Sequence, residues 1–320
     1  MKPCYIGFDT SNYTTSVAAC DGEGRIIANI KKLLTVKEGS RGLRQSDAVF
    51  EHVRNLPELV CQLSQSIEGY APVAVGVSVR PRDAEDSYMP CFLSGKSAAY
   101  SFASGCGAPV YELSHQNGHI IAALYSAERL ELLEKEQFVA FHVSGGTTEA
   151  LLVTPTDREF SVELVGQTAD INAGQAIDRV GVAMGLKFPC GVELEKLAKE
   201  FEGKIYSHPV CVRNGECSLS GAENIALKIY RESGDKSAAA AFLFDFIGKT
   251  LEKMCDHVMN EYGRCPVIFA GGVMSNVLMR ERLSRSFEAY FSEPAFSADN
   301  AAGIALLCKK NFDLTRKDGT

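Results

Sequence analysis

One local pattern occurs twice in this chain and constrains its fold more than any other feature. Residues 5–20 and 138–153 each read as an apolar run, a small polar turn and a second apolar run. The β-branched and aromatic flanks predict strands, and the turn residues predict a tight hairpin. A hairpin rich in hydroxyls and glycine exposes backbone N–H groups, which suits a phosphate. The repeat therefore indicates a duplicated domain with a nucleotide between its halves, against the alternative of two unrelated hairpins.

The remaining pattern predicts an α/β protein. Strands alternate with helices along the chain, and the hairpins predict a mixed sheet in each half. At 320 residues the chain has room for two domains. We expect an N-terminal lobe over residues 1–130 and a C-terminal lobe over residues 131–320. The last helix, about residues 300–312, is the segment that could pack back on the first lobe.

Composition narrows the class of protein. No apolar run has the length of a membrane span, and no signal peptide is visible, so we expect a cytoplasmic protein that does not enter the membrane. The eleven cysteines include no C-x-x-C pair, and Cys20, Cys61 and Cys308 lie in apolar stretches. They predict buried, reduced thiols. The net charge of −7 argues against non-specific nucleic-acid binding by this chain alone.

Two histidines have the spacing of a metal site. His115 and His119 are four residues apart behind Ser114, a good N-cap, so both rings should lie on one face at the start of a helix. Paired imidazoles at this spacing can hold a metal, although two half-buried helix histidines are the alternative. Gln116 stands where a metalloprotease needs Glu, which excludes that class. Asp299, before the last helix, could supply a third ligand or simply cap that helix.

The second hairpin and a later glycine pair are candidates for nucleotide binding. The turn over residues 143–148 combines two glycines with three hydroxyls, and a structural turn is its alternative. Gly271 and Gly272 follow a buried strand and precede a helix, a geometry that places a nucleotide at the strand ends. Asp178 and Glu195 flank a Pro-Cys-Gly turn and could accept ribose hydroxyls; taken alone, they are surface charges.

Five segments in order resemble one family over nearly the whole chain. They are residues 114–119, 143–148, 166–200, 270–276 and 299–302. Together they resemble TsaD, the tRNA N6-adenosine threonylcarbamoyltransferases formerly called sialoglycoprotein endopeptidases. The resemblance implies the duplicated, ribonuclease H-like fold shared by actin and the sugar kinases, with a nucleotide cleft between two lobes.

The resemblance also implies roles for particular residues, while no catalytic acid or base is assigned. His115, His119 and Asp299 match the metal ligands, a set that suits Fe(II) or Zn(II) without choosing between them. The resemblance implies substrate or nucleotide contacts for three groups of residues. The turn of the second hairpin supplies Val143, Ser144, Gly145, Gly146 and Thr147. The ribose-side residues are Asp178, Gly191 and Glu195, and the adenine-side loop contains Gly271, Gly272 and Asn276.

The implied activity is transfer of a threonylcarbamoyl group from threonylcarbamoyl-AMP to the N6 amine of a tRNA adenosine. The metal would orient the intermediate and act as a Lewis acid on it. Because the chain is acidic, we expect tRNA to be reached through a multiprotein complex with TsaB-like and TsaE-like partners, a heterodimer among its forms. ATP or AMP could occupy the same nucleotide site.

The chain departs from the family pattern at five positions. The first hairpin has Tyr13 within a turn that lacks the usual acidic pair, and Arg80 and Arg82 replace two glycines. Thr147 stands where His or Asn is usual, and Glu223 stands where Lys is typical. These changes indicate a diverged member or paralogue whose acceptor could differ from tRNA. A non-catalytic nucleotide-binding scaffold, as TsaB is, remains the second hypothesis, and a small-molecule kinase the third.

Overall fold

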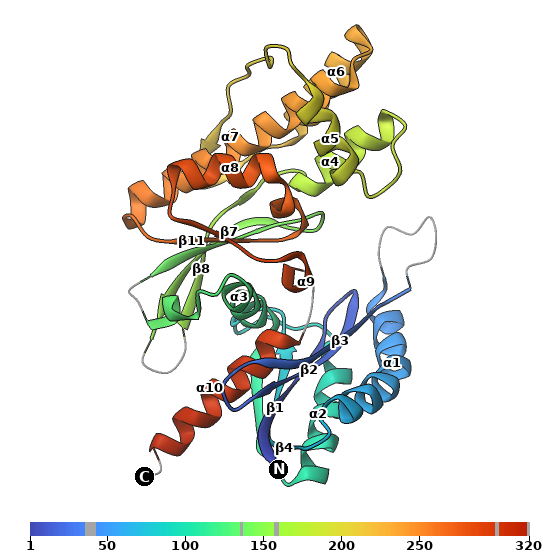
Figure 1. Ribbon diagram of the computed structural model, residues 1–320, viewed down its shortest axis with the longest axis vertical. Helices are drawn as coiled ribbons and strands as arrows, with labels where there is room; N and C mark the ends of the chain where they lie inside the picture. The colour runs from blue at the N-terminus through green and yellow to red at the C-terminus, as the bar shows by residue number, and fades with distance from the viewer. Residues whose placement is uncertain (36–42, 135–136, 157–159, 298–300, 319–320) are drawn as a thin grey trace. The chain divides into compact units, whose positions relative to one another are not determined.

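The chain folds into two units, each built on its own mixed β-sheet (Figure 1). The computed structural model describes residues 1–35, 43–134, 137–156, 160–297 and 301–318. One unit comprises Met1–Leu130 and Phe296–Thr320, and the other comprises Glu131–Ala295. The second unit therefore ends before the last helix instead of at residue 320, because that helix is packed on the first sheet.

The first sheet has the strand order β3-β2-β1-β4-β5. Strand β1 pairs antiparallel with β2 and parallel with β4, so the N-terminal hairpin is joined to a parallel half-sheet. The strands are β1 (Lys2–Thr10), β2 (Thr14–Asp21), β3 (Ile26–Leu33), β4 (Tyr70–Arg80) and β5 (Val110–Ser114).

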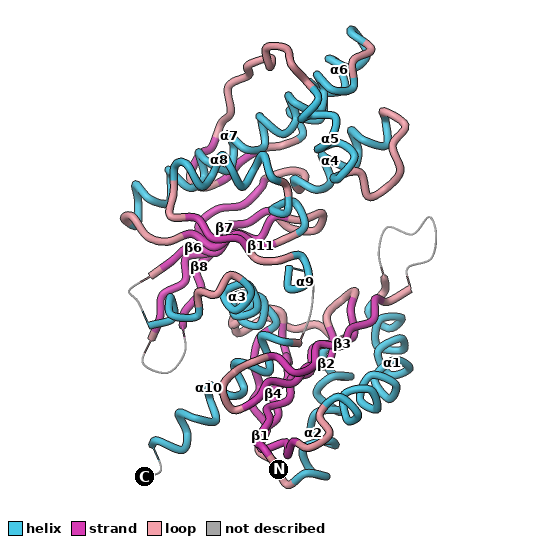
Figure 2. Tube along the Cα trace, viewed as in Figure 1, coloured by secondary structure: helices cyan, strands magenta, loops and turns pink. Residues whose placement is uncertain are grey.

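The second sheet repeats this arrangement and extends it (Figure 2). Its strand order is β12-β11-β6-β7-β8-β10-β9, with β6 antiparallel to β7 and parallel to β11. The hairpin β6–β7 thus takes the place that β1–β2 has in the first sheet, as the sequence repeat predicts. The strands are β6 (Phe138–Val143), β7 (Thr148–Pro155), β8 (Phe160–Thr168), β9 (Val212–Arg213), β10 (Glu216–Cys217), β11 (Val267–Ala270) and β12 (Ala289–Phe291).

Helices cover both faces of the first sheet. Helices α1 and α2 pack on one face, and α10 packs with α3 on the other (Figure 1). Glycines in two strands permit this close approach, because a Cβ at Gly7 would lie 2.6 Å from the backbone nitrogen of Ala305 and a Cβ at Gly76 would lie 2.8 Å from Cys308 Cβ. The helices are α1 (Gln45–Ser66), α2 (Phe92–Cys106), α3 (His115–Ser126) and α10 (Ala302–Asp318).

The second unit is organised around the long helix α7. Its buried face carries large apolar side chains, including Phe242 and Leu251, and it contacts α5, α6, α8 and the sheet. Burial of each such side chain contributes about 1.5–3 kcal/mol. The helices are α4 (Ala173–Ala183), α5 (Gly191–Glu200), α6 (Ser220–Ser233), α7 (Lys236–Tyr262) and α8 (Val277–Ser286); the short α9 (Pro294–Ser297) and the 3-10 turns η1 (Leu130–Glu134) and η2 (Gly272–Ser275) complete the set.

The cysteines and the helix lengths bear on the compositional predictions. All eleven cysteines are free thiols, and Cys20 and Cys308 are buried as predicted. Cys61 is exposed, so its prediction was wrong, because it lies on the solvent side of α1 despite its apolar sequence neighbours. Among the helices of the described residues, none combines the length and the hydropathy that crossing a membrane requires.

Candidate metal and nucleotide sites

Helix α3 begins at a fixed point, as its sequence predicts. The Ser114 hydroxyl accepts a hydrogen bond from the Asn117 backbone N–H at 3.2 Å, which caps the helix. Asp83 accepts hydrogen bonds from the Ser114 hydroxyl at 3.2 Å and from the Asn117 side chain at 2.5 Å. The carboxylate therefore lies beside the positive end of the helix dipole and holds the first turn in place.

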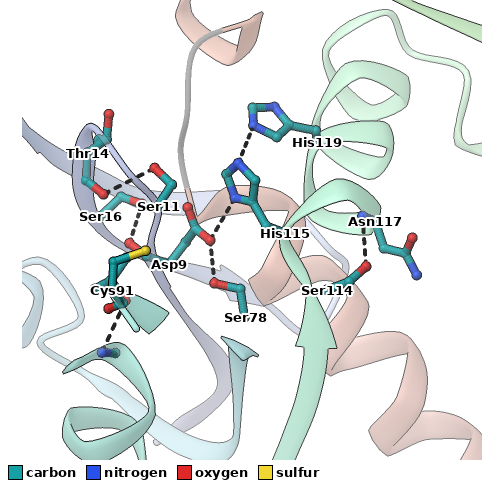
Figure 3. Close-up of polar contacts among 12 residues, drawn as sticks. Asp9, Ser11, Thr14, Ser16, Ser78, Cys91, Ser114, His115, Asn117 and His119 are labelled. Carbon is teal, nitrogen blue, oxygen red and sulfur yellow. Dashed lines mark hydrogen bonds and ion pairs between the residues drawn. The ribbon is translucent and has the colours of Figure 1, made fainter. Parts of the chain in front are cut away.

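The first turn of α3 brings the two histidines together (Figure 3). Nε2 of His119 lies within hydrogen-bond distance of Nε2 of His115, at 3.0 Å. Nδ1 of His115 lies 2.9 Å from Oδ1 of Asp9, and the Ser78 hydroxyl donates to the same oxygen. Asp9 and Ser78 are fully buried, whereas the His115 side chain is 20% exposed.

This geometry fits a metal at the histidine pair. Metal–nitrogen bonds are about 2.1 Å long, so two nitrogens 3.0 Å apart can reach one cation. Asp9 contacts the opposite ring nitrogen of His115, as carboxylates behind ligating histidines do. Within the described ranges, no group of three or more His, Cys, Asp or Glu side chains is arranged around a metal position. The predicted third ligand, Asp299, lies outside the described residues.

The buried side chain of His52 holds the first hairpin through two hydrogen bonds. Nε2 of His52 lies 2.8 Å from the Ser11 carbonyl oxygen, and its Nδ1 lies 2.8 Å from the Thr15 hydroxyl. Because a carbonyl only accepts, Nε2 carries the proton and Nδ1 accepts from Thr15. Asn55 also donates to the Thr15 hydroxyl. Burial lowers the pKa of His52, which favours this neutral ring, while Tyr13 at the turn is 45% exposed.

The glycine-rich turn of the second hairpin is folded on itself. The Ser144 hydroxyl accepts hydrogen bonds from the backbone N–H groups of Gly146 and Thr147 at 3.2 and 3.1 Å. Two of the amides expected to face a phosphate are therefore bonded inside the turn. Helix α4 begins against the same turn, because a Cβ at Gly174 would lie 2.6 Å from the Gly145 nitrogen.

The adenine-side loop lies against the start of this turn. Gly271 has φ +102°, and a Cβ there would clash with the Val143 carbonyl, so only glycine fits. Around a Cβ at Gly272, by contrast, the described chain leaves open space. The side-chain oxygen Oδ1 of Asn276 caps α8 by accepting a hydrogen bond from the Met279 N–H, while the buried side-chain nitrogen Nδ2 has no partner among the described residues. An unpaired buried donor is a group that a ligand could satisfy.

The ribose-side residues already have structural roles. Asp178 accepts a hydrogen bond from the Cys190 N–H at 2.8 Å, which ties α4 to the start of α5 at Gly191. Glu195 accepts one from the Val277 N–H at 3.3 Å, which ties α5 to α8. These contacts join the predicted nucleotide-binding residues of the second unit into one connected set. The assignment of Asp178 and Glu195 as ribose contacts stays a prediction.

Asp170 fixes the loop in front of α4. It accepts hydrogen bonds from the hydroxyls of Ser218 and Ser220 and from the backbone N–H groups of Leu219 and Ile171. Partial burial alone would raise the pKa of Asp170, but these hydrogen bonds outweigh it and hold the pKa well below its usual range. The start of α6 is thereby anchored beside the start of α4.

Two of the residues that depart from the family pattern, Arg80 and Glu223, have ion-pair partners. Arg80 pairs with Asp83 at 2.7 Å, next to the start of α3, and Arg82 is exposed. Glu223 pairs with Arg179 at 3.3 Å. Arg80 and Glu223 therefore each form a local ion pair.

Two residues of the histidine cluster were not assigned to it from sequence. Asp9 stands at the end of a buried strand and Ser78 on the neighbouring parallel strand, 69 residues later. A carboxylate inside an otherwise apolar strand was the available signal, but only the strand register brings it to α3.

Comparison with known proteins identifies the family. A family model described as TsaD, tRNA N6-adenosine threonylcarbamoyltransferase, matches residues 88–306, more than half of the chain. The chain belongs to the TsaD family. A tRNA N6-adenosine threonylcarbamoyltransferase of Methanopyrus kandleri is 26% identical over 305 residues, which cover 94% of this chain and 85% of that protein. TsaD membership thus confirms the resemblance that the five motifs carry.

Solved structures agree with the fold expected of a TsaD protein. Component A of (R)-2-hydroxyglutaryl-CoA dehydratase from Acidaminococcus fermentans matches with a TM-score of 0.55 at 15% identity, covering 96% of this chain and 98% of that one. A ROK family glucokinase from Streptomyces griseus matches with a TM-score of 0.53 at 13% identity, covering 98% and 99%. Full-length HypF matches with a TM-score of 0.57 at 14% identity, covering 98% of this chain and 55% of that one. At these identities the likeness concerns the fold alone, which is the predicted actin-like and sugar-kinase-like one.

Proposed function

We propose that this protein transfers a threonylcarbamoyl group from threonylcarbamoyl-AMP to the N6 amine of an adenosine in tRNA. The observation that carries the proposal is the convergence of His115 and His119 at 3.0 Å, backed by Asp9, in a chain of the TsaD family. A scaffold that only binds nucleotide has no need of two converging imidazoles with a carboxylate behind one of them.

In this reaction the N6 nitrogen attacks the carbamoyl carbon of the adenylate. A carbon–nitrogen bond forms, the bond between that carbon and the phosphate oxygen breaks, and AMP leaves with the electron pair while the amine loses a proton. His115 and His119 would hold a divalent metal, Fe(II) or Zn(II), with Asp299 as the third ligand by resemblance. When bound, the metal supplies Lewis-acid polarisation of the group under attack.

The second unit would hold the adenylate. Gly145, Gly146 and Gly272 leave open space for a ligand where other residues would place a side chain. The buried amide nitrogen of Asn276 is a donor to which the described chain offers no acceptor, so it suits a nucleotide hydroxyl or ring nitrogen. The Ser144 hydroxyl can still donate its own proton to a phosphate oxygen.

Partners would bring the tRNA. With a net charge of −7, the protein would repel a nucleic acid unless another chain supplied basic surface. We therefore propose TsaB-like and TsaE-like partners in the cytoplasm, including a heterodimer with the TsaB-like chain.

Gene replacement tests this function. The host's own TsaD gene is replaced by the gene for this protein, with the matching partner genes present, and tRNA nucleosides are analysed by mass spectrometry. We expect N6-threonylcarbamoyladenosine in the tRNA. Its absence, with folded and metal-loaded protein in the cell, would favour a transferase with another acceptor or a scaffold.

A further inference from the structure

We propose that Asp9 is the positioning residue that presents His115 to the metal, with Ser78 in turn fixing Asp9. The inference rests on the metal-binding part of the proposed function and extends it beyond the ligands. Oδ1 of Asp9 accepts hydrogen bonds from the Ser78 hydroxyl and from Nδ1 of His115. The contacts therefore run from β4 through β1 to α3 (Figure 3).

The contact determines which ring nitrogen of His115 can bind a metal. A carboxylate only accepts hydrogen bonds, so Nδ1 of His115 must carry the ring proton. The lone pair of the neutral ring then lies on Nε2, the atom 3.0 Å from Nε2 of His119. With the opposite tautomer, Nε2 of His115 itself would carry the proton and would have no lone pair for a cation.

Asp9 is held rigidly enough to impose this orientation. It is fully buried at the end of β1, where its backbone carbonyl also accepts a hydrogen bond from the Ser16 hydroxyl at 3.1 Å. Ser78 is fully buried on β4, the parallel neighbour of β1. The sheet therefore places the carboxylate, and the carboxylate places the ring.

The second carboxylate oxygen of Asp9, Oδ2, favours a cation close to the carboxylate. Oδ2 is buried and has no hydrogen-bond partner in the part of the chain that the structure describes. A buried carboxylate with an unsatisfied oxygen is unfavourable without a countercharge. A cation held by the two histidines would lie one imidazole ring away and would supply that charge.

A first experiment reads the tautomer directly in the metal-free protein. Long-range ¹H–¹⁵N spectra of protein labelled on its six histidines distinguish a proton on Nδ1 from one on Nε2, and His115→Gln identifies the signal. We expect His115 to carry its proton on Nδ1 in the parent and to lose that preference in Asp9→Ala. A parent His115 protonated on Nε2 would overturn the proposal, and this measurement does not depend on how well any Asp9 variant folds.

A second experiment measures Zn²⁺ affinity by competition with a chromophoric chelator. Loss of a carboxylate behind a ligating histidine weakens binding by about 10- to 100-fold, which we expect for Asp9→Asn and Asp9→Ala. The matched control is Asp21→Asn, because Asp21 is a buried carboxylate of the same sheet that pairs with Arg25 at the far end of the hairpin. We expect that control to bind within about twofold of the parent.

The outcomes separate this inference from the proposed function. Unchanged affinity in both Asp9 variants, with circular dichroism like that of the parent, overturns the role of Asp9 and leaves the metal site standing. A parent that binds no Zn²⁺ or Fe²⁺ overturns both the inference and the metal-dependent part of the proposed function.

Discussion

A single methyl group added at Gly303 should disturb the packing of the histidine-bearing helix. Gly303 is buried in the first turn of α10, where a Cβ would clash with the Gly118 carbonyl oxygen and lie 2.7 Å from its carbon. Carbon atoms pack at about 3.5–4.0 Å, so the helices would have to separate by about 1 Å. The obstacle is backbone, and no change of rotamer relieves it. His119 follows Gly118 directly, so the site would move as well.

The magnitude follows from two opposed effects. Overpacking a core costs about 1–3 kcal/mol, and a backbone clash belongs at the upper end. Replacing glycine by alanine in a helix raises the free energy of unfolding by at most about 1 kcal/mol. The net loss of about 2 kcal/mol corresponds to a Tm lower by roughly 4–8 °C for a domain of 150–250 residues.

Thermal unfolding followed by circular dichroism measures the effect of Gly303→Ala. The matched control is Gly105→Ala in α2, because outside the adjacent backbone of its own helix the described chain has no atom within 4 Å of a Cβ at that position. We expect the control to melt at or slightly above the parent temperature. If Gly303→Ala behaves like the control, the close packing of α3 on α10 is refuted.

Two further predictions concern the buried histidine and the nucleotide loop. Burial lowers the pKa of His52 below the value of about 6.5 expected for the unfolded chain, so the unfolded state takes up the proton first and stability is lost as pH falls below 6.5. His52→Gln should therefore lose less stability than the parent between pH 7 and 5 in urea unfolding; equal losses would contradict this. Gly272→Arg should abolish calorimetric binding of AMP or ATP while Gly272→Ala, which fits the open space, keeps it; equal affinities in the parent and both variants would exclude the loop from the nucleotide site.

The sequence predicts the duplicated fold because the repeat is local. Apolar alternation around a polar turn determines each hairpin, and both hairpins occupy equivalent places in their sheets. Helical periodicity alone does not show that α4 and α5 are two helices, separated by a segment that contains Pro189. The short strands β9, β10 and β12 could not be predicted, since segments of two or three residues show no readable period.

The candidate site likewise has one part that the local sequence predicts and another part that depends on tertiary structure. The spacing of His115 and His119 is a local helical property, and Ser114 marks where the helix starts, so this part of the geometry could be predicted. The contact of Asp9 with Ser78 and His115 could not, because it depends on the register of two strands and on the position of α3 beside them. The buried state of Asn276 likewise results from tertiary packing around α8.

Transfer measured with purified components tests the central claim most directly. The protein, the proposed TsaB-like and TsaE-like partners, a divalent metal, threonylcarbamoyl-AMP and unmodified tRNA are combined, and the digested nucleosides are quantified by mass spectrometry. We predict N6-threonylcarbamoyladenosine with the parent and at least about 100-fold less with His119→Ala, since Lewis-acid stabilisation of a transition state is worth several kcal/mol. No product from folded, metal-loaded parent in the complex, or equal product from His119→Ala, would contradict the account.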